Sequence, residues 1–534
     1  MNRANGSAVD RTIKGGSAAP AASDFLQLTA EAVPRGGLSD WLVDRIRQAI
    51  ADGRLPTGSR LPATRVLAAD LKVSRGVVTE AYRRLVDDGH VVGRGRAGTV
   101  VAATPLNGTG GAAGPTGAAG SAGAAPAGPA ATEVFDAQQR AGVFDAPPGA
   151  DVFDAFRTST ARIDLSPGLP DLAAFPRTAW LRAERAVLAE LASSDLGYGD
   201  PRGTRALRGA VAGWLRVNRG ITAEPEEIII VAGTAQALGL LAQVLRAEGV
   251  DRLAVEDPSS LGARQHLHSW GLTTPPVPVD AEGVRVDALR ASGAPAVLLT
   301  PAHQFPTGVV LGGERRRELV RWAGEGGLVI EDDYDAEHRY DRAPVAALAA
   351  MAPDHVCYSG SISKLLAPAL RVGWLLAPAR YRDALTDAKR FADLGNAALP
   401  QLVLARLMES GALERHLRLI RRRHRVRRDA MIAAIRSHLP HARVHGAAAG
   451  LHLTVTFPSG VRDTELASRA LAHGVKTQPL SWHTQLPGRP GLVLGYAAAA
   501  PTAIAEGIAV LGTLLTADGR PGGAAPGRAQ MPGR

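Results

Sequence analysis

The spacing of apolar side chains predicts three helices and a hairpin between residues 36 and 102. The apolar positions of 38–53 recur every fourth residue, the period of one helix face, and they are Leu38, Leu42, Ile46 and Ile50. A second, short helix is predicted over 64–71. A third follows Ser74, a residue type that caps helix N-termini. HVVGRGRAGTVVA then gives two short β runs around a glycine-rich turn. Two helices joined by a tight turn and followed by a hairpin are typical of a winged helix-turn-helix, whose second helix enters the major groove of DNA.

This arrangement predicts which side chains face DNA. The exposed side of the third helix carries Arg75, Thr79 and Arg83, and Arg75 lies at the N-terminal end that reaches base edges. An arginine that begins the preceding helix suits a phosphate, and two arginines in the hairpin turn suit the backbone or a minor groove. The predicted DNA-binding residues are Arg65, Ser74, Arg75, Thr79, Arg83, Arg94 and Arg96. The alternative is a small helical domain with solvated arginines.

Farther along the chain, short β-branched runs alternate with longer helical stretches. The runs are 228–231, 252–256, 296–300, 327–331 and 356–359. Such alternation favours an α/β fold with a mainly parallel sheet over about 156–516. Of the 29 residues in 103–131, 23 are Gly, Ala or Pro, which predicts a flexible linker that we extend to 155. We expect disorder over 1–35 and in the tail 517–534.

Composition and charge restrict the partners and the cellular compartment that we expect for the protein. The net charge of +10 favours a polyanionic partner weakly, because it is spread over 534 residues. No run of about 18 apolar residues is free of charge, so we expect no membrane span. The single cysteine, Cys357, allows no internal disulfide, which fits the cytoplasm. Lysine is rare, at five positions, and it is the side chain that forms an imine with an aldehyde.

One of these lysines lies in a segment that suits an aldehyde cofactor with a phosphate. YSGSISKLLAPALRVGW places Ser361 and Ser363 just before Lys364, and Arg371 seven residues after it. Hydroxyls and a guanidinium are good phosphate ligands. Gly233, Thr234 and Ala235, between an apolar strand and a helix, add free N–H groups that also bind phosphate. The alternative for Lys364 alone is an ordinary surface cation.

A second segment, GLVIEDDYDAEHRY, places acids directly after an apolar strand. A carboxylate there suits the ring nitrogen of pyridoxal 5′-phosphate (PLP), and Asp332 is the first candidate, with Asp333 as fallback. Tyr334 suits the 3′ oxygen of the ring. The alternative, a metal site, is disfavoured because no His/Asp ligand pattern accompanies the run, so we expect no metal.

These motifs resemble known families. Residues 61–102 resemble the GntR-type winged helix, although Ala63 and Val77 replace Ser and Thr of its motif. The two segments above, with the glycine turn, LGYGDPRGTRALRG and LLTPAHQFPTGVVL, resemble fold-type I aminotransferases in order and spacing. The combination resembles the MocR subfamily of GntR regulators. The resemblance implies a small C-terminal α/β domain, PLP on Lys364, Asp332 at the ring nitrogen and Arg371 at the phosphate. It also implies a homodimer, because Tyr198 resembles a tyrosine that reaches the phosphate of the partner.

Two positions depart from the aminotransferase pattern. Ser260 stands where many relatives have an aromatic ring that stacks on PLP, in EDPSSLG. Val493, in GLVLGYA, stands where aminotransferases carry an arginine that clamps the substrate carboxylate, and a neutral side chain cannot replace that fork. GLVLGYA and AAGLHL resemble the pyridoxine-biosynthesis (PdxR-type) branch.

Three functions follow from this reading. The first is a PLP-responsive regulator of vitamin B6 synthesis genes. The alternatives are a regulator that senses an amino compound through an external aldimine, and a working aminotransferase that carries a DNA-binding domain; whether any transaminase activity exists stays open. The basic stretch 414–429 is either a second DNA-contact surface or, as we favour, a solvated helix.

Overall fold

The chain forms two compact units, Met1–Ser121 and Ala122–Arg534, here called the head and the body. The computed structural model describes residues 38–51, 54–55, 58–87, 90–93, 98–101, 144, 148–335, 337–340 and 346–518. Each unit is described by itself.

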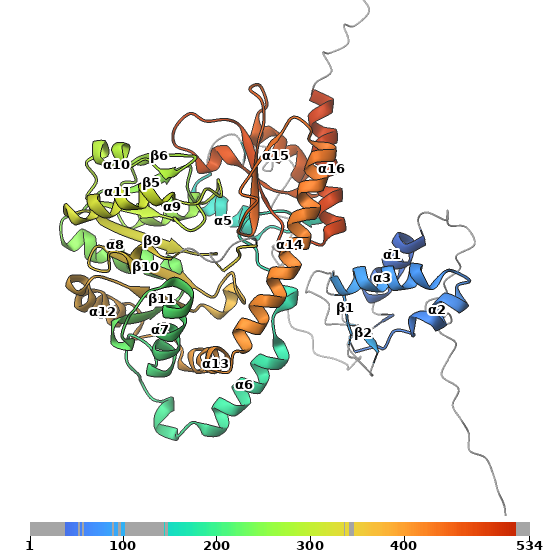
Figure 1. Ribbon diagram of the computed structural model, residues 1–534, viewed down its shortest axis with the longest axis horizontal. Coiled ribbons are helices and arrows are strands. Elements are labelled where there is room, and N and C mark those ends of the chain that lie inside the picture. Colours follow the sequence, from blue (N-terminus) through green and yellow to red (C-terminus); the bar gives the residue numbers. More distant parts are fainter. Residues whose placement is uncertain are drawn as a thin grey trace, which may run out of the picture. The chain divides into compact units, whose positions relative to one another are not determined.

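The head has the predicted helix-turn-helix and hairpin (Figure 1). Its elements are α1 (Leu38–Ala51), α2 (Thr64–Asp70), α3 (Arg75–Asp87), β1 (Val91–Gly93) and β2 (Thr99–Val101), and β1 pairs antiparallel with β2. Lys72 in the turn between α2 and α3 has a φ of 52°, the left-handed conformation that reverses the chain sharply. The apolar faces of the three helices close over one core that includes Leu42, Ile46 and Val78. The winged helix-turn-helix prediction is confirmed.

The large lobe of the body is built on an eight-stranded sheet in the order β4-β11-β10-β9-β8-β5-β6-β7. Only β11 and β7 run against the others. The strands are β4 (Ile228–Val231), β5 (Leu253–Asp257), β6 (Pro276–Asp280), β7 (Gly283–Val284), β8 (Ala296–Leu299), β9 (Leu328–Asp333), β10 (Val356–Ser361) and β11 (Gly373–Leu376). The five β runs read from the sequence are therefore strands of one mainly parallel sheet, and the α/β prediction is confirmed.

Helices cover both faces of this sheet, so its strands are apolar on both sides. In β4, Ile228 and Ile230 enter one core while Ile229 and Val231 enter the other. The helices of this lobe and its flanks are α6 (Arg177–Glu190), α7 (Arg205–Arg219), α8 (Thr234–Ala247), α9 (Leu261–Ser269), α10 (Val286–Ser292), α11 (Gly313–Gly324), α12 (Ala379–Asp393) and α13 (Ala398–Glu409).

The small lobe has a four-stranded antiparallel sheet in the order β12-β13-β16-β15. Its strands are β12 (Arg443–His445), β13 (His452–Thr456), β15 (Gln478–Pro479) and β16 (Gly491–Gly495), and its helices are α14 (Ala412–His438), α15 (Asp463–Ala472) and α16 (Pro501–Asp518). A separate parallel pair, β3 (Ile163–Asp164) with β14 (Val475–Lys476), ties the start of the body to this lobe. The long helix α14 runs alongside α16 (Figure 1).

The predicted linker ends earlier than residue 155. Helix α5 (Ala150–Thr158) and Phe144 belong to the body, because three phenylalanines pack around Trp482. Phe144 stacks on the indole with ring centroids 5.1 Å apart, and Phe153 and Phe156 meet it edge-on. The linker boundary is thus corrected to before residue 144 by a contact with a residue more than 300 positions away. Among the described residues, no helix has both the length and the apolar character needed to cross a bilayer.

Candidate cofactor site

The predicted cofactor residues meet at one edge of the large sheet. Strands β4, β9 and β10 all point the same way, so their carboxyl ends lie together, where open α/β sheets place ligands. Gly233 and α8 follow β4, Asp332 lies at the end of β9, and Lys364 follows β10. Ser359 of β10 pairs directly with Asp332, which fixes the register of the two strands.

The first part of the site is a cradle for an anion. Gly233 has a φ of 83° and caps α8, and a Cβ there would lie 3.4 Å from the guanidinium of Arg371. The guanidinium donates to the carbonyl of Ala232, and Ser361 donates to the hydroxyl of Ser363 over 2.8 Å. Within the described residues, the N–H groups of Thr234 and Ala235, the first two of α8, have no backbone acceptor. Amide, hydroxyl and guanidinium donors around one point fit a phosphate.

The second part is the lysine. The amine of Lys364 donates to the carbonyl of Gly168, which has a φ of 81° and where a Cβ would lie 3.2 Å from the amine. Burial lowers the pKa of Lys364, while the carboxylates of Asp335 and Asp332 oppose that shift. A lysine amine whose pKa is lowered is more often unprotonated, which is the form that reacts with an aldehyde.

The third part separates the two candidate acids. They are neighbours on β9 and therefore face opposite sides of the sheet. Asp332 lies beside the Thr234 hydroxyl, 3.3 Å away, on the side of the cradle. Burial, with a smaller contribution from Asp333, raises the pKa of Asp332 to about 7.

Asp333 lies on the other face and is already bonded. It accepts from the buried Arg219 and from the hydroxyl of Tyr358 at 2.6 Å. Arg219 also donates to Glu337 at 2.6 Å. Asp333, the fallback candidate, is therefore part of a buried ion-pair network. Of the two acids, Asp332 is the one that lies on the side of the cradle.

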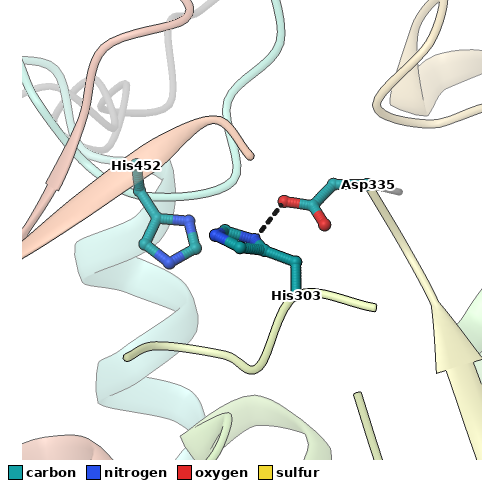
Figure 2. Close-up of side chains that lie close together, drawn as sticks. All are labelled: His303, Asp335 and His452. Carbon is teal, nitrogen blue, oxygen red and sulfur yellow. Dashed lines mark hydrogen bonds and ion pairs between the residues drawn. The ribbon is translucent and has the colours of Figure 1, made fainter. Parts of the chain in front are cut away.

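Tyr334 brings in residues that the sequence did not single out. Its hydroxyl lies 3.1 Å from Nδ1 of His303 and 3.2 Å from the carbonyl oxygen of the same residue. His303 Nδ1 also lies 2.9 Å from the carboxylate of Asp335, and His452 of β13 stands on the other side of the His303 ring (Figure 2). His303 and Asp335 both occur in motifs noted above, HQFPTG and EDDYDAEHRY, but only the pairing of β8 with β9 brings them together.

These three side chains are a candidate metal cluster, since one ligand atom from each lies within 4.8 Å of the others. The contacts favour a hydrogen-bonded cluster instead. His303 bonds Asp335 directly, and His452 Nε2 lies 3.1 Å from the carbonyl of Pro306.

The remaining predicted residues lie elsewhere. Tyr198 is 97% exposed and stands outside the cradle of its own chain. In the head, Arg65, Ser74, Arg75 and Thr79 are exposed as predicted. Arg83 is exposed too, but its guanidinium is held by Glu80 at 2.6 and 2.9 Å. Arg94 and Arg96 lie outside the described residues.

Comparison with known proteins agrees with this architecture. Residues 161–484 match the family Aminotransferase class I and II, and residues 38–101 match Bacterial regulatory proteins, gntR family. The probable rhizopine catabolism regulatory protein MocR of Rhizobium meliloti is 32% identical, over 88% of this chain and 91% of its own length. The HTH-type pyridoxine biosynthesis transcriptional regulator PdxR of Corynebacterium glutamicum is 31% identical, over 80% and 86%. The chain belongs to the MocR type of GntR-family regulators.

Solved structures support the same fold for the body. The kynurenine aminotransferase of Pyrococcus horikoshii, solved with PMP, superposes with a TM-score of 0.63 at 28% identity, covering 70% of this chain and 94% of that one. A MocR-type regulator of this kind is a DNA-binding transcription factor whose body binds PLP.

Two sites in this MocR-type body differ from an aminotransferase. Ser260, at the stacking position, caps α9 instead: its hydroxyl accepts from the N–H of Ala263 at 3.3 Å. Val493, at the arginine position, is fully buried in β16 opposite Thr454. The Thr454 hydroxyl donates to the carbonyl of Pro306 at 2.5 Å, so this face of the small sheet is closed against the 303–308 loop.

Proposed function

We propose that this MocR-type regulator controls vitamin B6 synthesis genes and responds to PLP itself. The observation that carries the proposal is Val493. Its cross-strand neighbours, Thr454 and Gln478, are hydrogen-bonded to Pro306 and to His483, so the face that holds the carboxylate clamp in aminotransferases is already filled by uncharged contacts. An amino acid would lose its bidentate partner there, whereas PLP needs only the cradle, Lys364 and Asp332.

Each residue of the site has a proposed part in holding PLP. Gly233, Thr234 and Ala235, with Arg371, Ser361 and Ser363, would bind the phosphate. The Lys364 amine would bond the aldehyde, Asp332 would pair with the ring nitrogen, and Tyr334 would donate to the ring oxygen. The bound cofactor supplies an electrophilic aldehyde on an electron-withdrawing ring.

We also propose that the body works as a homodimer. Tyr198 and Leu196 are 97% and 74% exposed, and on α12 Phe391 is 86% exposed. Gly395, at the end of α12, lies against Pro201, so these segments adjoin on one surface. Exposed apolar side chains grouped in this way mark interaction sites. A second copy would cover them and bring its Tyr198 to the cradle.

The test is DNA binding measured with and without PLP on the full chain. A footprint at promoters of vitamin B6 synthesis genes should change on adding PLP and not on adding pyridoxine 5′-phosphate, which has the phosphate but no aldehyde. Borohydride reduction followed by mass spectrometry should place a pyridoxyl adduct on Lys364, and Lys364→Ala should lose both the adduct and the response.

Other outcomes would favour the alternatives. A footprint that responds to one amine in the PLP-loaded protein supports amine sensing, and steady turnover with an amino donor and a keto acid supports an aminotransferase. A wild-type protein that forms no adduct overturns the PLP site altogether.

A further inference from the structure

A buried hydrogen-bonded chain lies directly behind Tyr334. Asp335, His303 and Tyr334 are linked by contacts of 2.9 and 3.1 Å that both end on Nδ1 of His303 (Figure 2 shows the first). His303 and Asp335 are each 1% exposed. Such buried contacts are held in one geometry, because breaking them leaves buried polar groups unpaired.

The protonation states follow from the partners. Burial raises the pKa of the Asp335 carboxyl, but His303, together with His452 and His338, lowers it by more. The net pKa is lowered, so Asp335 is an anion and accepts. Nδ1 of His303 therefore carries the proton, and it points to both Asp335 and the Tyr334 oxygen. Burial raises the pKa of Tyr334 well above its ordinary value, so Tyr334 keeps its proton. Without PLP, the hydroxyl donates that proton to the carbonyl oxygen of His303 at 3.2 Å, from which it can turn to a bound ring oxygen.

We propose that His303 is a positioning residue: held by Asp335, it donates to the oxygen of Tyr334, aims the Tyr334 hydroxyl at the ring oxygen of PLP, and so sets the pH at which bound PLP changes protonation. The inference rests on the PLP site proposed above. A hydroxyl that accepts one hydrogen bond donates a stronger one. A stronger donor at the ring oxygen favours its ionised form, and this lowers the pH of the transition.

Other charged and titratable groups surround this chain and act on the same equilibrium. Those that act on Tyr334 or His303 from the neighbouring elements are Asp332, Glu256, His338 and His452, and Lys364 acts on Asp335. None of them has a hydrogen bond to the Tyr334 hydroxyl within the described part of the chain. His303 and Asp335 are the residues whose side chains bond that hydroxyl, and the Tyr334→Phe background shows whether an effect of His303 passes through it.

Two substitutions of similar size at His303 test whether the N–H group at Nδ1 is what matters. His303→Asn keeps an N–H near the place of Nδ1, and His303→Leu removes it. In the full chain loaded with PLP, the midpoint of the pH-dependent change in the visible absorption should rise in His303→Leu by about 0.1–0.7 pH units, because one hydrogen bond strengthens the next by roughly 10–30% of its 1.5–3 kcal/mol. The midpoint in His303→Asn should stay close to that of the wild type.

A double substitution provides the control. Tyr334→Phe should raise the midpoint at least as far, and His303→Leu added to it should produce no further shift, because the effect passes through Tyr334. An unchanged midpoint in His303→Leu, or an equal shift in the Tyr334→Phe background, overturns the inference. If His303→Leu fails to fold, as judged by operator binding, His303→Gln replaces it, because the glutamine amide lies one bond too far from the backbone to bond Tyr334. A wild-type midpoint in His303→Gln also overturns the inference.

A wild-type protein with no visible band and no reducible adduct would instead refute the PLP site.

Discussion

In the absence of PLP, the Asp332 carboxyl is mostly protonated below neutral pH. Its pKa of about 7 lies above the ordinary value of 3.8, because it is buried beside Asp333. The folded state therefore holds a proton that the unfolded chain has already lost, and the free energy of unfolding falls as pH rises between these values. Near pH 8 we expect PLP-free Asp332→Asn to be more stable than wild type, by about 1–3 kcal/mol. Urea unfolding at about pH 8 and pH 5 measures this, and the difference should shrink at the lower pH.

The same substitution should weaken PLP binding by roughly 10–100-fold, since the ring nitrogen loses a charged partner. Asp333→Asn is the matched control: it breaks the buried contact with Arg219, so it should destabilise the protein at both pH values. An Asp332→Asn protein that is less stable at pH 8 and binds PLP normally would contradict this assignment.

The two acids show how far sequence reasoning reaches at this scale. An apolar run followed by EDDYD predicted a carboxylate at the sheet edge, and alternation predicts that Asp332 and Asp333 face opposite ways. Which of them faces the cofactor depends on the covering helices, since α8 lies over one face and Arg219 of α7 over the other. His303 and Asp335 were missed because their contact is made by the pairing of β8 with β9, across 32 residues of sequence.

At the scale of elements, α3 presents two arginines in different states. Arg75 at its start is exposed, and among the described residues no acid pairs with it, whereas Arg83 is forked onto Glu80. An arginine must give up such a pair before it binds DNA, so its net contribution is smaller. We expect Arg75→Ala to weaken operator binding by about 1–3 kcal/mol and Arg83→Ala by less. Fluorescence anisotropy with operator DNA measures both, and equal losses would contradict the assignment.

Helix α5 shows where composition misleads. It follows a Gly/Ala/Pro-rich stretch, and local pattern placed most of it in the linker. What orders it is Trp482, a partner in the small lobe that no local pattern reveals. Its aromatic contacts do not depend on the cofactor, so they are a stability feature of the body.

Phe156→Ala should therefore lower the free energy of unfolding of the body by about 3–5 kcal/mol, the cost of a large cavity in a packed core. Phe156 is 1% exposed and its ring meets Trp482 edge-on at 5.2 Å. Val217→Ala is the control, because that side chain is 79% exposed, is not among those proposed to lie in the dimer interface, and should contribute little to stability. Urea unfolding followed by tryptophan fluorescence measures both, and equal costs would mean that α5 is not part of the core.

At the scale of the whole molecule, head and body are separate units whose sites bind different ligands, DNA and PLP. Under the proposed function the two binding equilibria are coupled, and the coupling free energy is the same in both directions. If PLP changes operator affinity by a given factor, operator DNA must change PLP affinity by that factor. Typical couplings of 1–3 kcal/mol correspond to about 5–150-fold.

This reciprocity is a test that needs no knowledge of whether PLP activates or represses. PLP affinity of the full chain should be measured with saturating operator and with DNA of scrambled sequence, and operator affinity with and without PLP. The two factors should agree, and in Lys364→Ala both should fall to one. A PLP affinity indifferent to operator would mean that PLP is a fixed part of the body and not the effector, because a ligand with equal affinity for two states shifts neither.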